Sequence, residues 1–140
     1  KKRAEIDLRF KQGVIMLHAK QYDSAMKAFH RVIELAPNMP EAHVNMGFAL
    51  LGKKEWAAAA DFFDEASNLR SDQLNAYYGM AVAQEGLGNL RTAVEAMQAY
   101  LHRAPANDPF RTKAEAAVWE WQETLRKERE KTPAKPGKGK

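Results

Sequence analysis

The sequence predicts an all-α solenoid of three helix-turn-helix repeats, closed by a fourth and longer C-terminal helix. Two observations predict it. Apolar residues recur three and four positions apart, which is the helical period. Small, large apolar and helix-ending residues also recur at a spacing of 34 residues, and self-similarity at such a period is typical of helical-repeat folds.

Four columns of residues share the 34-residue register. Small side chains form two of them, because two antiparallel helices approach closely where they cross. A large apolar residue forms the third and fills the space between neighbouring pairs. Proline dominates the fourth, since it removes a backbone donor and ends the second helix. The columns are Gly13, Gly47 and Ala81; Ala25, Ala59 and Ala93; Phe29, Phe63 and Met97; Pro37, Ser71 and Pro105.

The register predicts one domain over residues 6–131, with repeats at 6–39, 40–73 and 74–107. We expect first helices at residues 6–19, 40–53 and 74–87, and second helices at residues 23–36, 56–70 and 90–103. The clearest turn between two helices is Gly88-Asn89, because both residues tolerate the left-handed conformation that ends a helix. The equivalent turns at Lys20-Gln21 and at residues 53–55 are less favoured.

The closing helix is expected at residues 109–131. Asn107 or Asp108 is its N-cap and Pro109 its first helical residue, an arrangement that starts helices well. One face of this helix is apolar and covers the last repeat, as the open end of a repeat array requires: Phe110, Ala114, Ala117, Val118, Trp121 and Leu125. Trp119 points nearly the opposite way. It either rests half-buried on neighbouring charged side chains or is a second contact residue for a partner, since Trp is enriched at interface hot spots.

The last residues, 132–140, contain no side chain able to pack in a core, and they predict a disordered basic tail. Net charge is +4, yet residues 126–140 alone carry +5, so the rest of the chain is close to −1. The excess of basic residues therefore belongs to the C-terminal end. Binding of nucleic acid or anionic membrane through this tail is an alternative function, and a flexible solubilising end is the interpretation we favour.

These columns resemble those of the tetratricopeptide repeat (TPR) family over residues 6 to about 107. Tyr22 and Trp56 lie at the aromatic position that opens the second helix. Three residues depart from the pattern: Arg9 and His43 occupy the large-aromatic position of the first helix, which only Tyr77 fills, and Leu90 replaces the third aromatic. The resemblance implies a superhelix whose first helices line a concave groove that binds another protein.

The inward positions of the first helices form an apolar groove with one central amide: Phe10, Val14, Leu17, Val44, Asn45, Phe48, Leu51, Tyr78, Gly79 and Val82. Three interpretations stay open. The groove binds a peptide or helix from another protein. Alternatively, residues such as Val14, Leu17 and Leu51 pack between adjacent first helices and leave little free area. In the third, a second copy of the chain fills the groove and makes a homo-oligomer.

One groove type in the TPR family clamps the C-terminal carboxylates of chaperones with Lys and Asn in the first helix, Asn in the second, and Lys and Arg in the third. The matching positions in this chain are Phe10, Val14, Asn45, Asn75 and Gly79, so only the central Asn is kept. A carboxylate there would lose its hydration without gaining a charged partner. We therefore expect an apolar or amphipathic segment, with anchors three and four residues apart.

The sequence carries no catalytic or metal-binding pattern, so we expect neither an enzyme nor a cofactor nor a small-molecule substrate. There is no Cys, and the four His residues are not paired at helical spacing, which makes a metal site improbable: His18, His30, His43 and His102. We expect most of these to be surface or half-buried side chains. Asp61, Asp64 and Glu65 form an acidic stripe that is typical of a solvated outer face.

The sequence does not fix a cellular compartment. We favour the cytoplasm, because Lys1, Lys2 and Arg3 suit a segment just cytoplasmic of a membrane anchor that would precede the first residue.

Overall fold

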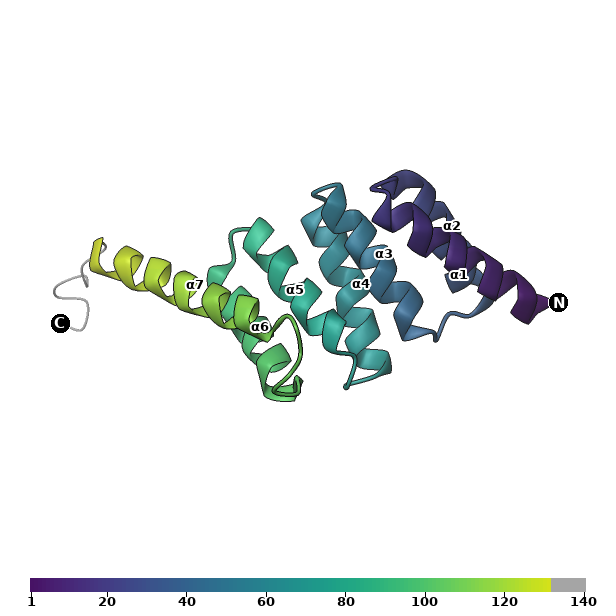
Figure 1. Cartoon of the computed structure of the whole chain (residues 1–140). Helices are drawn as coiled ribbons and strands as arrows, with labels where there is room; N and C mark the ends of the chain where they lie inside the picture. Colours follow the sequence, from purple (N-terminus) through teal and green to yellow (C-terminus); the bar gives the residue numbers. More distant parts are fainter. Residues whose placement is uncertain (132–140) are drawn as a thin grey trace, which may run out of the picture.

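The computed structural model describes residues 1–131, which form seven α-helices and no strand (Figure 1). In chain order the helices are α1 (Lys2–His18), α2 (Tyr22–Leu35), α3 (Pro40–Gly52), α4 (Trp56–Leu69), α5 (Leu74–Gly86), α6 (Leu90–Arg103) and α7 (Arg111–Lys131). The predicted all-α solenoid, with three helix pairs and a closing helix, is confirmed. The predicted tail, residues 132–140, lies outside the described residues.

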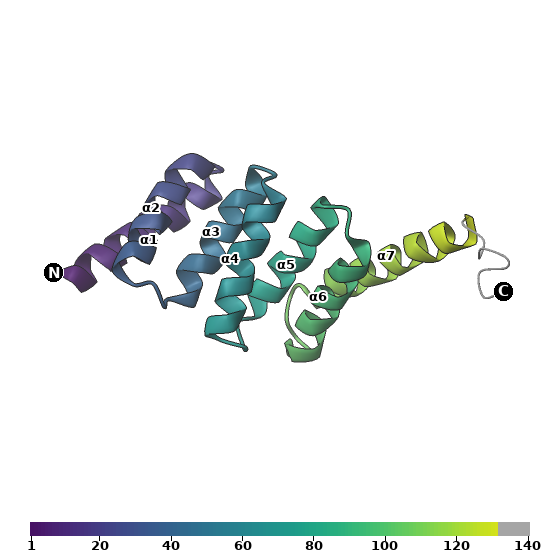
Figure 2. The ribbon, with the colours of Figure 1, turned by 180° about the vertical axis from the view of Figure 1, so that it is seen from behind.

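The helices form an elongated stack in which odd-numbered helices occupy one face and even-numbered helices the other (Figures 1 and 2). Each helix packs against its neighbours in sequence, and odd helices also contact each other from α1 to α3 and from α3 to α5. The N-terminus and the end of α7 therefore lie at opposite ends of the stack. No helix within residues 1–131 is long and apolar enough to span a membrane.

Two helix boundaries differ from the sequence expectation. Helix α1 begins at Lys2 rather than at residue 6, since nothing between these positions breaks a helix. Helix α7 begins at Arg111 rather than at Pro109. The side chain of Asp108 accepts a hydrogen bond from the backbone N–H of Phe110 at 3.0 Å, so residues 109–110 form a turn before the first helical turn.

The glycine and phenylalanine columns meet inside the first two repeats. A Cβ atom placed on Gly13 would lie 2.6 Å from the ring of Phe29, and one on Gly47 would lie 2.7 Å from the ring of Phe63. Both rings are completely buried. Glycine is therefore required at these crossings because the aromatic ring occupies the space of its missing side chain.

All three turns inside the repeats use a left-handed residue at the same column. Lys20 and Lys54 both have φ 61°, and Gly88 has φ 83°. A lysine in this conformation is strained by roughly 1 kcal/mol, whereas glycine is not. The turns at Lys20 and Lys54, which the sequence made less favourable, thus adopt the same geometry as the turn at Gly88. The packing of the helix pairs imposes this geometry.

Three of the four histidines, His18, His30 and His102, are exposed, as expected for most of them, and His43 is the buried one. Its Nε2 lies 2.8 Å from the carbonyl oxygen of Pro37. The hydroxyl of Tyr77 donates to the carbonyl of Ser71 at 2.7 Å. Tyr77 and Ser71 lie 34 residues after His43 and Pro37, respectively. His43 therefore makes in the second repeat the contact that an aromatic residue makes in the third.

Helix α7 closes the C-terminal end of the stack. Ala114, Val118 and Trp121 are buried, and the indole Nε1 of Trp121 donates to a carboxylate oxygen of Glu85 at 3.2 Å. Phe110 is an exception to the predicted covering face, because it precedes α7 and is exposed. The apolar residues therefore cover the last repeat as predicted, from the second turn of α7 onwards.

Candidate partner-binding groove

The predicted groove residues lie on the odd-numbered helices and differ in how much of each side chain stays accessible. Eight are half-buried: Phe10, Val14, Leu17, Asn45, Phe48, Leu51, Tyr78 and Val82. Val44 is only 2% exposed and belongs to the same buried cluster as Phe63 and Ala76. The prediction of Val44 as a contact residue is wrong, because its own side chain is covered by this cluster, unlike Phe10 and Tyr78 of the same column.

Gly79, the other small residue of the predicted groove, is buried against the core. A Cβ atom on Gly79 would lie 2.3 Å from the ring of Phe63. The side chain of Phe63 thus fills the space beneath both Gly47 of its own repeat and Gly79 of the next. Gly79 shapes the floor of the groove and offers no side chain to a partner.

Each repeat anchors one groove aromatic on the core by an edge contact. Ring centroids are 5.8 Å apart for Phe10 and Phe29, and 5.1 Å apart for Phe48 and Phe63. In the third repeat Tyr78 lies 5.4 Å from Tyr100. All three pairs are T-shaped, which is a favourable aromatic geometry. These groove side chains are therefore held rigidly, with one edge in the core and the other accessible.

A hollow of about 490 Å³ lies at the α1 end of the groove. Its lining is apolar with one acidic and one basic residue: Asp7, Phe10, Lys11, Val14, Ile15 and Met39. Ile15 is 65% exposed, and the sequence analysis did not include it among the groove residues. The repeat gives no signal for it, because the equivalent residues of the later repeats are the buried Ala49 and Ala83.

Trp119 is 66% exposed, as expected for a residue that points away from the covered face of α7. The buried residues of α7 repeat the spacing of His43, Gly47 and Leu50 on α3: Ala114, Val118 and Trp121. Trp119 follows Val118 as Phe48 follows Gly47. This register aligns Trp119 with the groove column of Val14, Phe48 and Val82.

The 34-residue period could not place Trp119, because the linker before α7 is longer than the others. Helix α4 ends at Leu69 and α5 begins at Leu74, whereas α6 ends at Arg103 and α7 begins at Arg111. The three additional residues shift α7 against the repeat. A register based on burial, and not on sequence distance, aligns it again.

Two polar groups in the groove are available to a ligand. Within residues 1–131, the Asn45 amide and the Tyr78 hydroxyl make no hydrogen bond. Burial raises the pKa of Tyr78, so the phenol stays neutral and can donate a hydrogen bond near pH 7. None of the five positions that match the chaperone clamp carries a cation: Phe10, Val14, Asn45, Asn75 and Gly79.

Two other hollows lie outside the groove. One of about 760 Å³ lies between α6 and α7 and is lined mainly by charged residues, among them Arg91, Glu95, Arg126 and Arg129. The other, of about 640 Å³, lies between α2, α3 and α4 and is mainly apolar. Its apolar residues are Met26, Met46, Leu50, Ala58 and Phe62. Within residues 1–131 no group of three or more His, Asp or Glu side chains is placed to hold a metal ion.

Comparison with known families decides the classification. Residues 16–84 match one tetratricopeptide repeat family, and residues 75–107 match a second. The chain belongs to the tetratricopeptide repeat family. The TPR resemblance seen in the sequence columns is thereby confirmed, and the matched residues include α3 and α5 in full but only the last three residues of α1 and none of α7.

Three relatives show how far the likeness extends. Protein bimA of Emericella nidulans is 27% identical over 73 residues, which are 52% of this chain and 9% of bimA. The chain thus spans under a tenth of that relative. The first TPR domain of Spaghetti (RPAP3), bound to the HSP90 peptide SRMEEVD, has a TM-score of 0.81 at 20% identity and covers 88% of this chain and 94% of its own.

The Sgt2 TPR domain of Aspergillus fumigatus has a TM-score of 0.83 at 15% identity, covering 94% of this chain and 86% of its own. At these identities the two structures establish a shared TPR fold.

Proposed function

We propose that this TPR domain is a protein-binding module whose groove holds an apolar or amphipathic segment of another protein. The observation that carries the proposal is a column of accessible apolar side chains on α1, α3 and α5, and the register of buried residues assigns Trp119 of α7 to the same column. Val14, Phe48 and Val82 are half-buried, and Trp119 ends the column with 66% of its surface exposed. A Trp next to a rigid apolar surface is typical of an interface anchor.

The chemistry of the groove favours this ligand over an acidic chaperone tail. The structural neighbour Spaghetti (RPAP3) is bound to a peptide that ends in EEVD. In this chain the five clamp positions hold two apolar residues, two amides and a glycine. A terminal carboxylate would be desolvated there without a charge-assisted hydrogen bond. The Asn45 amide and Tyr78 hydroxyl instead suit the backbone of a neutral segment.

The same features support a role without catalysis. Within residues 1–131 the groove offers no nucleophile beside a base and no paired carboxylates; its polar groups are the Asn45 amide, the Tyr78 phenol, and Asp7 and Lys11 at the α1 end. The TPR family match places the chain among helical repeats whose surfaces bind other proteins. We therefore propose a scaffold that needs neither cofactor nor small-molecule substrate.

A binding assay with two peptides tests the groove. The first is a fluorescein-labelled helical peptide with leucines three and four residues apart and an uncharged Gln/Ser face, and the second ends in EEVD. We expect the first to bind the wild-type chain at least about tenfold more tightly, measured by fluorescence anisotropy. Trp119→Glu should then weaken the apolar peptide by about tenfold or more, because it places a charge in the apolar column.

The variant is chosen because Trp119 is exposed and its replacement leaves the core intact. Phe48 is less suitable, since its ring rests on Phe63 at 5.1 Å and a charge there would also disturb folding. Circular dichroism of Trp119→Glu should match the wild type. Unchanged affinity in Trp119→Glu, or tighter binding of the EEVD peptide, would show that the proposal is wrong.

Two alternatives are tested by the same protein. If the module is a self-associating assembly protein, light scattering at micromolar concentration will give the mass of an oligomer. If the basic tail binds nucleic acid or anionic membrane, removal of residues 132–140 will abolish that binding and leave peptide binding intact. We favour the peptide-binding function because edge contacts with buried rings hold the accessible groove aromatics Phe10, Phe48 and Tyr78 in place.

A further inference from the structure

The α1 end of the stack exposes two aliphatic residues at positions that are buried in the later repeats. Leu8 is 52% exposed and Ile15 is 65% exposed. The residues 34 and 68 positions later are all alanines with at most 1% exposure: Ala42, Ala49, Ala76 and Ala83. The alanines of α3 lie on a helix that contacts α1, and those of α5 lie on a helix that contacts α3.

The comparison identifies the face of an odd helix that receives the preceding odd helix. On α3 and α5 that face holds alanine, which allows close approach. On α1 the same face holds larger side chains and no helix within residues 1–131 covers it. Leu8 and Ile15 are seven residues apart, so they lie on one line along α1. Two aliphatic residues on such a line fit a helix that lies alongside α1.

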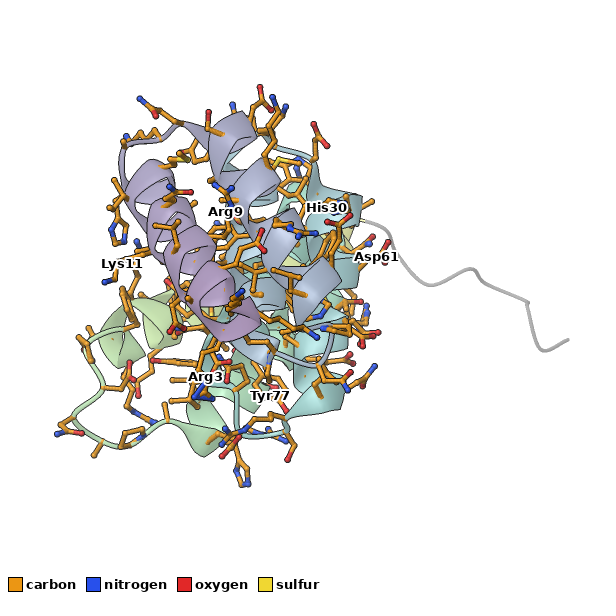
Figure 3. All side chains as sticks on the ribbon, turned by 90° about the vertical axis from the view of Figure 1, so that its right-hand side faces the viewer. Arg3, Arg9, Lys11, His30, Asp61 and Tyr77 are labelled. Carbon is orange, nitrogen blue, oxygen red and sulfur yellow. The ribbon has the colours of Figure 1, made fainter. Side chains whose placement is uncertain are left out.

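Helices α1 and α2 carry more cations than carboxylates: Lys2, Arg3, Arg9, Lys11, Lys27 and Arg31 against Glu5, Asp7, Asp23 and Glu34. Arg9 donates a hydrogen bond to the neutral Gln12 at 3.0 Å, and within residues 1–131 neither Arg9 nor Lys27 forms an ion pair. Arg31 binds Glu5 at 2.8 Å and Glu34 at 3.3 Å. Figure 3 views this end of the stack, with Arg9 between α1 and α2 and Lys11 on the far side of α1.

A shallow hollow of about 380 Å³ lies between α1 and α2 on this same surface. Its lining combines three cations with Met16 and small polar groups: Arg9, Gln12, Met16, Ser24, Lys27, Ala28 and Arg31. Carboxylates of a partner that reach this hollow would meet Arg9 and Lys27, whose charges no acidic side chain of residues 1–131 neutralises by an ion pair. The apolar line on α1 and the cations of α1 and α2 thus lie at the same end of the molecule, with Leu8 next to Arg9 in the sequence.

We propose that this N-terminal edge, formed by Leu8, Arg9, Ile15, Lys27 and Arg31, binds an acidic amphipathic helix of a partner protein. The leucine-type residues of that helix lie on Leu8 and Ile15, and its carboxylates face Arg9 and Lys27. Ile15 also lines the hollow at the α1 end of the groove, whereas the other four residues of this edge lie outside the concave groove of the proposed function. The chain would therefore hold two partners, or two segments of one partner, at the same time.

A second copy of this chain is a poorer occupant of the edge. If two such edges met, Arg9 and Lys27 of one copy would approach the cations of the other, and like charges across an interface are unfavourable. An acidic helix avoids this repulsion and adds attraction that depends on salt. Charge thus selects the partner, and the aliphatic pair fixes its position.

The test uses two labelled helical peptides that share leucines seven residues apart, one with glutamates and one with lysines at the flanking positions. We expect the glutamate peptide to bind the wild-type chain at least about tenfold more tightly at about 50 mM salt. The difference should narrow at about 500 mM salt, where screening is stronger. Lys27→Glu should lower the affinity of the chain for the glutamate peptide by about threefold to tenfold.

Leu8→Glu and Leu87→Glu form a matched pair, since each replaces an exposed leucine by glutamate on the surface. Leu8→Glu should weaken the glutamate peptide by about tenfold or more, and Leu87→Glu should leave its affinity unchanged. Trp119→Glu should also leave it unchanged, although that variant weakens the groove peptide. Leu8→Glu and Trp119→Glu therefore distinguish a failure of the edge proposal from a failure of the groove proposal.

Three results would overturn the proposal. One is equal affinity for the two peptides, or no binding of either up to roughly millimolar concentration. Another is equal binding by Leu8→Glu and Leu87→Glu. The third is a dimer in light scattering that Leu8→Glu abolishes, since a second copy would then be the occupant of the edge.

Discussion

The pairing of Gly13 with Phe29 shows how a single residue fixes the distance between two helices. The ring of Phe29 occupies the place where a Cβ atom of residue 13 would lie, at 2.6 Å from the ring. The third repeat uses a different pair at the same columns, Ala81 with Met97, and both belong to one buried cluster. A flexible methionine can bend away from a methyl group, whereas a phenyl ring cannot.

Gly13→Ala should therefore destabilise the domain, although alanine is the better helix former. We expect the free energy of unfolding to fall by about 1–3 kcal/mol, as in other overpacked cores. The double variant Gly13→Ala, Phe29→Met recreates the pair of the third repeat. It should lose about 1 kcal/mol less than the sum of the single changes.

Urea unfolding followed by circular dichroism measures all four corners of this cycle. Additive losses, within about 0.3 kcal/mol, would mean that the side chains at positions 13 and 29 do not compete for the same space. The edge repeat is chosen because Phe63 also lies beneath Gly79, so the equivalent cycle at Gly47 would disturb two repeats at once.

At the scale of the helix, Asp108 connects the end of one element with the start of the next. Its carboxylate accepts a hydrogen bond from the hydroxyl of Tyr100 on α6 and one from the backbone of Phe110 at 3.0 Å. Burial, followed by the bond to Asp108, raises the pKa of Tyr100 to about 12. Hydrogen bonding from Tyr100 in turn lowers the pKa of Asp108 below its ordinary value of 3.8.

The lowered pKa of Asp108 predicts how the docking of α7 depends on pH. A carboxyl group whose pKa is lower in the folded state stabilises it at pH above the unfolded value, and this contribution disappears as pH falls through the folded value. Asp108→Asn should therefore lower the melting temperature most at pH 7, and the difference from wild type should shrink toward pH 3.

Thermal melts at pH 7, 5 and 3, followed by circular dichroism, give this comparison. In a Tyr100→Phe background the donor is gone, so Asp108→Asn should change the melting temperature less. A difference that stays the same from pH 7 to pH 3 would mean that the charge of Asp108 does not help to fix the start of α7.

The helices and their pairing could be predicted from the sequence because the columns repeat wherever the physical requirement repeats. Two features of the groove could not. Val44 occupies the same column as the half-buried Phe10 and Tyr78, and only packing shows that it is covered. Trp119 is shifted from its column by the longer linker between Arg103 and Arg111, which a fixed period cannot anticipate.

At the scale of the whole molecule, the two ends of the stack differ in whether their apolar side chains are covered. Helix α7 covers the buried cluster of the third repeat with Ala114, Val118 and Trp121, while the α1 end leaves Leu8 and Ile15 exposed. In a solenoid each unit is stabilised only by its neighbours. The C-terminal closure must therefore come from α7 itself, and the α1 end is where a further helix can be added.

The two tryptophans of α7 separate closure from binding. Trp121 is buried in the cluster with Met97 and donates to Glu85 at 3.2 Å, so Trp121→Ala should lower the free energy of unfolding by about 3–5 kcal/mol. Trp119→Ala removes a side chain that is 66% exposed and should change it by at most about 0.5 kcal/mol. Urea unfolding monitored by circular dichroism compares the two variants. Each repeat is stabilised only by its neighbours, so in Trp121→Ala α7 and the third repeat should unfold before the other repeats. The unfolding transition should therefore become broader. Equal destabilisation by both variants would mean that Trp119 is packed against the stack, and the groove column would then end at Val82.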